Sequence, residues 1–598
     1  MARRLFAERH GRAPRDAREL SGFVAQESRA PQVAVSGFDL TFSPVKSVSV
    51  LWALASPDIV RSIEAAHLAA VDDTIAWLER DVAFTRSGIG GVRQVAVRGL
   101  AATAFTHRDS RAGDPDLHTH VAVSNKVQTL PEEGGRWLAL DGRVLYKAKV
   151  AASERYNTRL ETELVERLGV RFVERPTTDG KRPIREIDGI DQLLARKWSS
   201  RRSMINRRRG QLAHRFQADH ARPPRPVEAL ALAQRATLET RDAKHEPRSE
   251  ADQRRTWRHE AARWLGGEEP VDEMVSSAHY VETVLAGRPD VVAMADQVVE
   301  TVSDARATWQ GWHIRAEAER QARAVRLPRA DLDSVVERMV DHALTVCSER
   351  LGPSDPVSEP APLRRPSGAS VYEVAGAATY TSARILGAEE QILEIAGRTD
   401  GWRVSEELVA DVIDNLRGDT GELNAEQAAL VRELATSGRR VQLALAPAGS
   451  GKTCAMRVLV QVWYTAGGHT VALAPSAAAA KEISRAADID ADTLAKLAHA
   501  VRTQPEEQWP AWMREIGPRS LVIVDEAGMA AATDLAVAIE FALSRGASVR
   551  LVGDDQSAHL GRRRWCAARH RPPPRRGAPI PPAPLRRPCG GGRHALAA

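Results

Sequence analysis

Alternating apolar and polar residues predict strands at two places in the first 130 residues. Residues 37–42 carry apolar side chains at every second position, and a helical pattern follows Pro44. Residues 117–123, LHTHVAV, follow a Gly-Asp-Pro turn and end in alternating β-branched residues, as strands do. Because residues i and i+2 of a strand point to one face, we expect His118 and His120 to project two imidazoles toward one point.

Apolar residues recur at helical spacing through much of the remaining chain. Residues 58–81 form one such segment, and His67 within it is predicted to be structural. Residues 187–265 and 270–350 are also helical in pattern and strongly polar. A Pro/Ser-rich stretch at residues 352–368 is predicted to be a linker.

The bulk composition indicates a globular protein of several domains. The chain has 598 residues, too many for one core, and 43% of them are hydrophobic. No apolar run reaches the ~20 residues of a membrane span, so no membrane insertion is expected. The arginine-rich start lacks the apolar segment of a secretory signal. The four cysteines are scattered without disulfide or zinc spacing, which favours the reducing cytoplasm.

Charge is concentrated in particular segments rather than spread over the chain. The formal net charge is +6, but residues 557–598 contain ten arginines and no Lys, Asp or Glu, and without those ten charges the remainder carries −4. Residues 195–210 form a local basic run. Such a run is suited to DNA phosphates, and the alternative is a solvated helix face. The candidate phosphate contacts are Arg201, Arg202, Arg207 and Arg208.

A third histidine makes a metal centre the leading hypothesis for the first domain. His107 lies on an earlier strand-like run, and a hairpin would return it to the pair formed by His118 and His120. Three neutral imidazoles with open positions describe a catalytic metal site rather than a closed structural one. The alternative is that these are ordinary surface or core histidines.

The segments HRDSRAGDPDLHTH (107–120) and GFDLTFSPVKSVSVLWAL (37–54) resemble motifs of conjugative relaxases of the TrwC/TraI (MobF) class, which are HUH endonucleases. The resemblance implies a relaxase domain over residues 1–265, with an antiparallel sheet and helices. It implies that His107, His118 and His120 hold Mg²⁺ or Mn²⁺, with Zn²⁺ as an alternative. Asp39 matches the supporting acid, and Lys46 is a further candidate for DNA contact.

The family's catalytic tyrosines lie near the N-terminus, whereas the first tyrosine of this chain is Tyr146. The resemblance therefore implies that an N-terminal strand and the nucleophilic tyrosine are missing. Tyr146 and Tyr156 follow, the latter in a predicted helix. Either could in principle replace the missing nucleophile, but spacing on an amphipathic helix favours packing roles.

A phosphate loop defines a second functional block. APAGSGKT follows an apolar run at residues 441–445 and precedes a helix, which is the context the motif needs. Backbone N–H groups would hold phosphate oxygens, Lys452 would balance their charge, and Thr453 would ligate Mg²⁺. Asp525 would hold Mg²⁺ through water, and Glu526 would activate the attacking water. The remaining loop residues in this prediction are Ala446, Gly449, Ser450 and Gly451.

Several short segments in order resemble superfamily 1B helicases. LNAEQ supplies Gln427, matching an adenine-reading glutamine, and LVGDDQ supplies Gln556, matching a γ-phosphate sensor. The resemblance implies a RecA-like ATPase domain with a parallel sheet, using ATP and Mg²⁺, over residues 369–556. Residues 266–351 would then be a helical connecting region. The predicted fold class is thus multi-domain α/β.

The resemblance stops at Gln556, and an Arg/Pro-rich tail follows at residues 557–598. Its composition cannot bury a core, so it is expected to be disordered. One interpretation is a basic tail that binds DNA, and the other is out-of-frame translation. The change inside a motif favours the second.

The two resemblances together imply a function in conjugative DNA transfer. The relaxase part would nick one strand at an origin of transfer by transesterification, and the helicase part would unwind it 5′ to 3′ with ATP. Single-stranded DNA, relaxosome accessory proteins and coupling proteins would be partners. Because both ends are interpreted as truncated, we expect a partial or inactive copy. The alternatives are a non-catalytic single-stranded-DNA-binding remnant and a DNA-stimulated ATPase.

Overall fold

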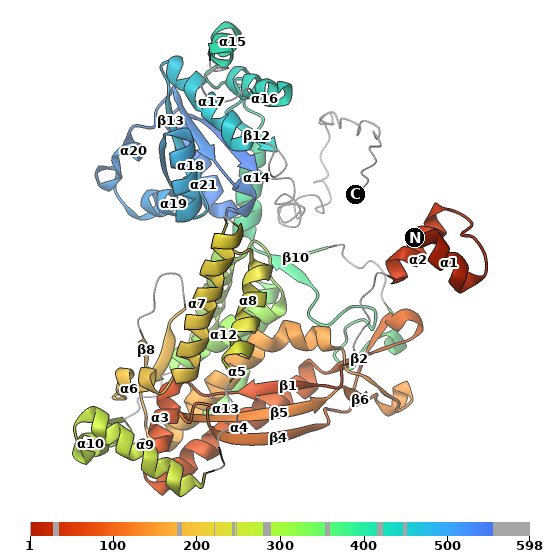
Figure 1. The fold of residues 1–598 in the computed structure, drawn as a ribbon, viewed down its shortest axis with the longest axis vertical. Coiled ribbons are helices and arrows are strands. Elements are labelled where there is room, and N and C mark those ends of the chain that lie inside the picture. Colours follow the sequence, from red (N-terminus) through yellow and green to blue (C-terminus); the bar gives the residue numbers. More distant parts are fainter. Residues whose placement is uncertain are drawn as a thin grey trace. The chain divides into compact units, whose positions relative to one another are not determined.

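The computed structural model describes two compact units (Figure 1). The first covers most of the chain up to residue 383, and the second begins at Arg384. The structure describes residues 2–27, 35–175, 182–220, 222–241, 246, 248–278, 289–352, 359–415, 423–445 and 451–553. The predicted tail at residues 557–598 lies outside these ranges.

A three-stranded antiparallel sheet in the order β1-β5-β4 organises the first unit. Its strands are β1 (Gly37–Phe42), β4 (Ala102–Asp109) and β5 (Pro115–Ser124). In β5, the central strand, buried and less buried side chains alternate along its length. This is the pattern of a sheet with one face on a core, and it confirms the predicted strands and the β4–β5 hairpin.

Helices α3 (Lys46–Leu54), α4 (Pro57–Asp81) and α5 (Gly142–Leu168) contribute to the core with the buried residues of β5. The helix predicted at residues 58–81 is confirmed as α4. The other elements up to residue 278 are small antiparallel pairs and polar helices: α1 (Ala2–His10), α2 (Ala17–Glu27), β2 (Phe84–Ser87), β3 (Arg93–Ala96), β6 (Lys126–Gln128), β7 (Trp137–Ala139), β8 (Phe172–Arg175), β9 (Ile184–Ile187), α6 (Gln192–Lys197), α7 (Ser200–His220), α8 (Pro226–Glu239), α9 (Glu250–Leu265) and α10 (Glu268–Ala278).

The predicted helical connecting region belongs to the first unit. It contains α11 (Val291–Ala305), α12 (Gly311–Val325) and α13 (Arg329–Thr345), and α12 packs against α5. An ion network joins these helices to α4 and α5. Arg155 lies 2.8 Å from Asp73 and 2.9 Å from Asp333, and the buried Glu319 lies 3.5 Å away. Burial raises the pKa of Glu319, against the opposing effect of the guanidiniums.

The stretch predicted to be a linker departs from that prediction where it is described. Residues 361–363 form a helical turn, and the buried Arg365 donates a 2.6 Å hydrogen bond to Oε1 of Gln94 on β3. A buried amide is destabilising unless it forms hydrogen bonds, and Arg365 donates one to the Gln94 side chain. Residues 359–383 therefore belong to the first unit, and most of the second unit lies from Arg384 onward. Two short strands, β10 (Glu349–Leu351) and β11 (Thr379–Thr381), form a separate pair.

The second unit is built on a five-stranded parallel sheet in the order β12-β16-β15-β13-β14. The predicted α/β class with a parallel sheet is confirmed. The strands are β12 (Val441–Leu445), β13 (His469–Ala474), β14 (Asp490–Thr493), β15 (Ser520–Val524) and β16 (Ser548–Gly553). The helices are α14 (Ala383–Ile395), α15 (Glu406–Asn415), α16 (Ala425–Thr436), α17 (Lys452–Thr465), α18 (Ala477–Ala487), α19 (Leu494–Thr503), α20 (Ala511–Arg514) and α21 (Ala532–Ser544).

Among the described residues, no helix combines the length and the apolar character needed to cross a bilayer.

The ion network predicts an uneven response to arginine substitutions. Arg155→Met leaves Glu319 buried with fewer compensating charges, and we expect the unfolding free energy of the first unit to fall by about 3–5 kcal/mol. Arg61→Met, which breaks an exposed pair with Asp58, should cost below about 1 kcal/mol. Urea unfolding followed by tryptophan fluorescence measures both. Equal losses in the two variants would contradict a structural role for the network.

Candidate metal and nucleotide sites

The β4–β5 hairpin brings the three predicted histidines onto one face of the sheet. His107 pairs directly with His118 across the strands, and His120 follows two residues later. The ring centroid of His107 lies 5.2 Å from that of His118 and 5.3 Å from that of His120, and the last two lie 5.2 Å apart. Strand alternation and hairpin register therefore produce the predicted convergence of imidazoles.

Neighbouring oxygens orient two of these rings. Nδ1 of His120 lies 2.9 and 3.0 Å from the carboxylate oxygens of Asp39 and 3.2 Å from the hydroxyl of Thr41. Nδ1 of His118 lies 2.7 Å from the carbonyl oxygen of Asp116. Because carboxylate and carbonyl oxygens accept, each Nδ1 is assigned the proton, and each Nε2 keeps a lone pair. Such outer partners are typical of metal-binding histidines, so the donor set fits a divalent metal.

A series of side-chain hydrogen bonds holds the opposite face of β5 against the core. Thr119, between the two histidines, lies 2.8 Å from Nε2 of His67 and 2.9 Å from the hydroxyl of Thr106. Nδ1 of His67 lies 2.8 Å from the Tyr156 hydroxyl. Burial, with a smaller contribution from His118, lowers the pKa of His67 to about 4. The predicted structural role of His67 is confirmed, whereas its link to the metal motif had no signal in the sequence.

The two tyrosines of α5 differ in environment. Tyr156 is 3% exposed, and burial raises its pKa well above the usual value, which agrees with its predicted packing role. Tyr146 is 68% exposed, so the packing prediction is wrong for this residue. The reason is that Leu145 and Ala148 occupy the buried side of that helical turn.

A cavity of about 560 Å³ runs along the edge strand β1. Tyr146 lines it together with Asp39 and Thr41. The exposed tyrosine thus shares a cavity with the carboxylate that orients His120.

The predicted DNA contacts fall into different settings. The Lys46 ammonium donates to the Pro115 carbonyl at the start of β5, and burial lowers the pKa of Lys46. On α7, Arg208 forms a 2.6 Å ion pair with Glu239, and Arg201 is half-buried. Arg202 and Arg207 are exposed. These two side chains remain the best placed of the set to meet phosphates.

The described part of the predicted nucleotide site gathers around the start of α17. Gly451 precedes this helix with φ +79°, and a Cβ there would lie 2.3 Å from the Gln427 amide nitrogen. Gln427 therefore lies beside Gly451, the described end of the phosphate-loop motif. A cavity of about 270 Å³ is lined by, among others, Lys452, Thr453, Asp525, Glu526 and Gly553. Four further predicted residues lie outside the described part of the chain: Ala446, Gly449, Ser450 and Gln556.

Asp525 and Glu526 follow directly after the last residue of β15, and both line this cavity. Burial raises the pKa of Asp525, while the Glu526 N–H and Lys452 act in the opposite direction. The Asp525 carboxylate accepts a 2.9 Å hydrogen bond from that N–H, and Glu526 adopts a left-handed backbone with φ +49°. A non-glycine residue in this region costs free energy, and such strain is common at functional sites.

Two family models match the chain. Residues 3–264 match the TrwC relaxase family, and residues 422–564 match an AAA domain family. The second match extends eight residues past Gln556, where the sequence resemblance was expected to stop.

Curated relatives share segments of the chain. A conjugal transfer protein TraA of Rhizobium radiobacter is 31% identical over 134 residues, which are 22% of this chain and 11% of that protein. A multifunctional conjugation protein TraI of Escherichia coli is 40% identical over 105 residues, which are 17% of this chain and 6% of that protein. The chain matches between 6% and 15% of the length of such relatives.

Solved structures of the conjugative relaxase TrwC in complex with oriT DNA are also similar. A metal-free one is 29% identical, covers 40% of this chain and 78% of that chain, and has a TM-score of 0.31. A metal-bound one is 25% identical, covers 45% of this chain and 86% of that chain, and has a TM-score of 0.30.

His67 predicts a pH dependence of stability. Its pKa is lowered to about 4 in the folded chain, so between pH 6.5 and 4 the unfolded state binds more protons. Stability is therefore full above pH 6.5 and falls by up to about 3 kcal/mol as the pH drops to 4. His67→Gln should flatten this part of the profile, measured by urea unfolding at each pH. His313, whose pKa burial also lowers to about 4, is present in both chains and cancels. Parallel profiles would contradict the prediction.

Proposed function

We propose that this chain, which joins a relaxase domain of the TrwC class to a helicase-like AAA domain, holds a divalent metal with His107, His118 and His120 and acts with it on single-stranded DNA. The observation that carries the proposal is the convergence of three imidazoles, with Asp39 against Nδ1 of His120. Mg²⁺ or Mn²⁺ is the proposed ion, with Zn²⁺ as the alternative.

Each group of residues would have a different role in strand transfer. A metal bound by the histidines would polarise a phosphate oxygen of the DNA. Asp39 holds His120 in the tautomer that exposes Nε2, and Asp116 does the same for His118 through its carbonyl. Exposed arginines of α7 would neutralise backbone phosphates. The DNA partner is proposed to be a single strand at a transfer origin, because residues 3–264 match the TrwC relaxase family.

Strand transfer also requires a nucleophile. Among the described tyrosines, Tyr146 combines exposure with a place in the cavity that Asp39 lines. In the proposed step, the Tyr146 oxygen would form a bond to phosphorus as the 3′-oxygen leaves, and the phenol proton would pass to Asp39 or water.

Metal binding is predicted to depend on Asp39 as well as on the histidines. In calorimetric titrations of the full chain with Mn²⁺, His118→Ala should abolish binding at this site. Asp39→Asn should weaken it by about 10- to 100-fold, because the amide holds the His120 tautomer less firmly. Asp58→Asn, an exposed carboxylate on α4, is the matched control. Undiminished Mn²⁺ binding in His118→Ala would refute the metal assignment.

Cleavage and binding of DNA separate the proposal from a non-catalytic DNA-binding role. The probe is a pool of labelled single-stranded oligonucleotides, with covalent adducts resolved on denaturing gels. The proposal predicts Mn²⁺-dependent adducts that disappear in His118→Ala and Tyr146→Phe. Binding that survives His118→Ala without any adduct in the wild-type chain would favour the non-catalytic role. Adducts that persist in Tyr146→Phe would assign the nucleophile elsewhere.

The cavity at α17 favours a second function, ATP binding and turnover. It is lined by an ammonium, a hydroxyl and three carboxylates, those of Glu482, Asp525 and Glu526, which suits a phosphate chain with Mg²⁺. Gln427 beside Gly451 is proposed to contact adenine. This function would operate whether or not the histidine centre cleaves DNA.

Nucleotide binding is predicted to depend on Lys452. Lys452→Ala removes a charged contact to phosphate and should weaken binding of a fluorescent ATP analogue by about 10- to 100-fold. It should also remove phosphate release stimulated by single-stranded DNA. Lys481→Ala on α18, an exposed lysine, is the control and should behave as wild type. Equal affinities in the three chains would contradict the assignment of this cavity.

A further inference from the structure

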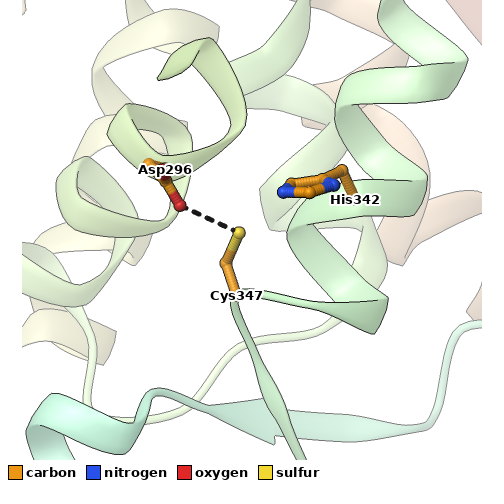
Figure 2. A group of neighbouring side chains, drawn as sticks. All are labelled: Asp296, His342 and Cys347. Carbon is orange, nitrogen blue, oxygen red and sulfur yellow. Dashed lines mark hydrogen bonds between the residues drawn. The ribbon is translucent and has the colours of Figure 1, made fainter. Parts of the chain in front are cut away.

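A second group of metal-ligand side chains lies in the helical part of the first unit. Asp296, His342 and Cys347 each offer one ligand atom, and these three atoms lie within 4.8 Å of one another (Figure 2). The His342 imidazole faces the pair formed by the Asp296 carboxylate and the Cys347 thiol. No motif marks the group in the sequence, because Asp296 and Cys347 are 51 positions apart.

Local backbone structure fixes two of the three residues. His342 lies in the last turn of α13, and its carbonyl oxygen accepts hydrogen bonds from the N–H groups of Val346 (2.9 Å) and Cys347 (3.2 Å). This closing turn folds Cys347 back beside His342, as helix C-caps do. Asp296 comes from α11, which packs against α13. Helix packing and the cap therefore bring the three ligands together without help from a metal.

The charges around the group favour a cation. The Cys347 thiol donates a 3.1 Å hydrogen bond to Asp296, and burial together with that carboxylate raises the pKa of Cys347 to about 12. The C-terminal end of α13 adds the negative end of a helix dipole. Two groups that can carry negative charge, Asp296 and Cys347, thus face each other beside an imidazole.

We propose that Asp296, His342 and Cys347 form a second metal site, which binds a zinc-like divalent transition ion and ties α11 to the end of α13. One oxygen, one nitrogen and one sulfur donor suit a borderline-soft ion, and three protein ligands leave a fourth position for water. On binding, the Cys347 S–H bond breaks, the sulfur bonds to the ion, and the proton leaves to solvent. The thiolate distinguishes this site from the three-histidine centre, and the inference does not rest on the proposed function.

Cobalt(II) tests the site through a signal that requires a thiolate. Titration of Co²⁺ into the reduced full chain should give a sulfur-to-cobalt charge-transfer band that saturates at about one ion per chain. The band should be lost in Cys347→Ser, and the apparent affinity should fall at least about 10-fold in Asp296→Asn and His342→Ala. Asp341→Asn, an exposed neighbour, should titrate as wild type. His118→Ala should keep the band, because the histidine centre contains no sulfur.

Three results would overturn the proposal. The first is the absence of the band in the wild-type chain. The second is its persistence in Cys347→Ser, which would place the ion on another cysteine. The third is an unchanged affinity in both Asp296→Asn and His342→Ala, which keep the thiol and test the other two ligands. As a check on folding, in chains that also carry His118→Ala, which disables the histidine centre, Zn²⁺ should raise the Tm of Asp341→Asn and leave that of Cys347→Ser unchanged.

Discussion

The two-residue alternation of β5 is the constraint on which the candidate metal centre depends. One face of this strand sets Thr119 against His67 in the core, and the other presents His118 and His120. A slip of one residue would exchange the faces, placing the imidazoles in the core and a threonine at the site. The buried side therefore fixes the register in which the histidines meet. The neighbouring strands complete the site, with His107 from β4 and Asp39 from β1.

In the second unit, a different constraint places the polar residues of the candidate nucleotide site. Its strands are parallel, and the central strands β13, β15 and β16 are almost wholly buried, so the polar groups of the candidate site follow strand ends and a helix start rather than alternating along a strand. Asp525 and Glu526 follow β15, and Lys452 and Thr453 open α17. The carboxyl ends of parallel strands are the usual place for ligands in α/β sheets. Strand ends thus position the residues proposed to bind nucleotide, as strand faces position the histidines.

Sequence reasoning reached the parts of both sites that depend on short-range periodicity. The histidine hairpin and the helix at residues 58–81 followed from spacing and turn residues, and the parallel-sheet class followed from the resemblance to superfamily 1B helicases. The sequence did not predict the features that depend on contacts between distant segments. The burial of Arg365 against Gln94, the bond from Lys46 to Pro115 and the meeting of Asp296 with Cys347 leave no local pattern. The packing role predicted for Tyr146 was wrong because Leu145 already fills the buried side of its turn of α5.

The most direct test of the account is the nitrogen coordination of Mn²⁺ bound to the full chain, measured by electron spin echo modulation. The account predicts couplings to ¹⁴N from three imidazoles, reduced to two or lost with the ion in His118→Ala. A spectrum that shows water protons alone, or imidazole couplings unaffected by His118→Ala, would contradict the claim that the β4–β5 hairpin builds a three-histidine metal centre.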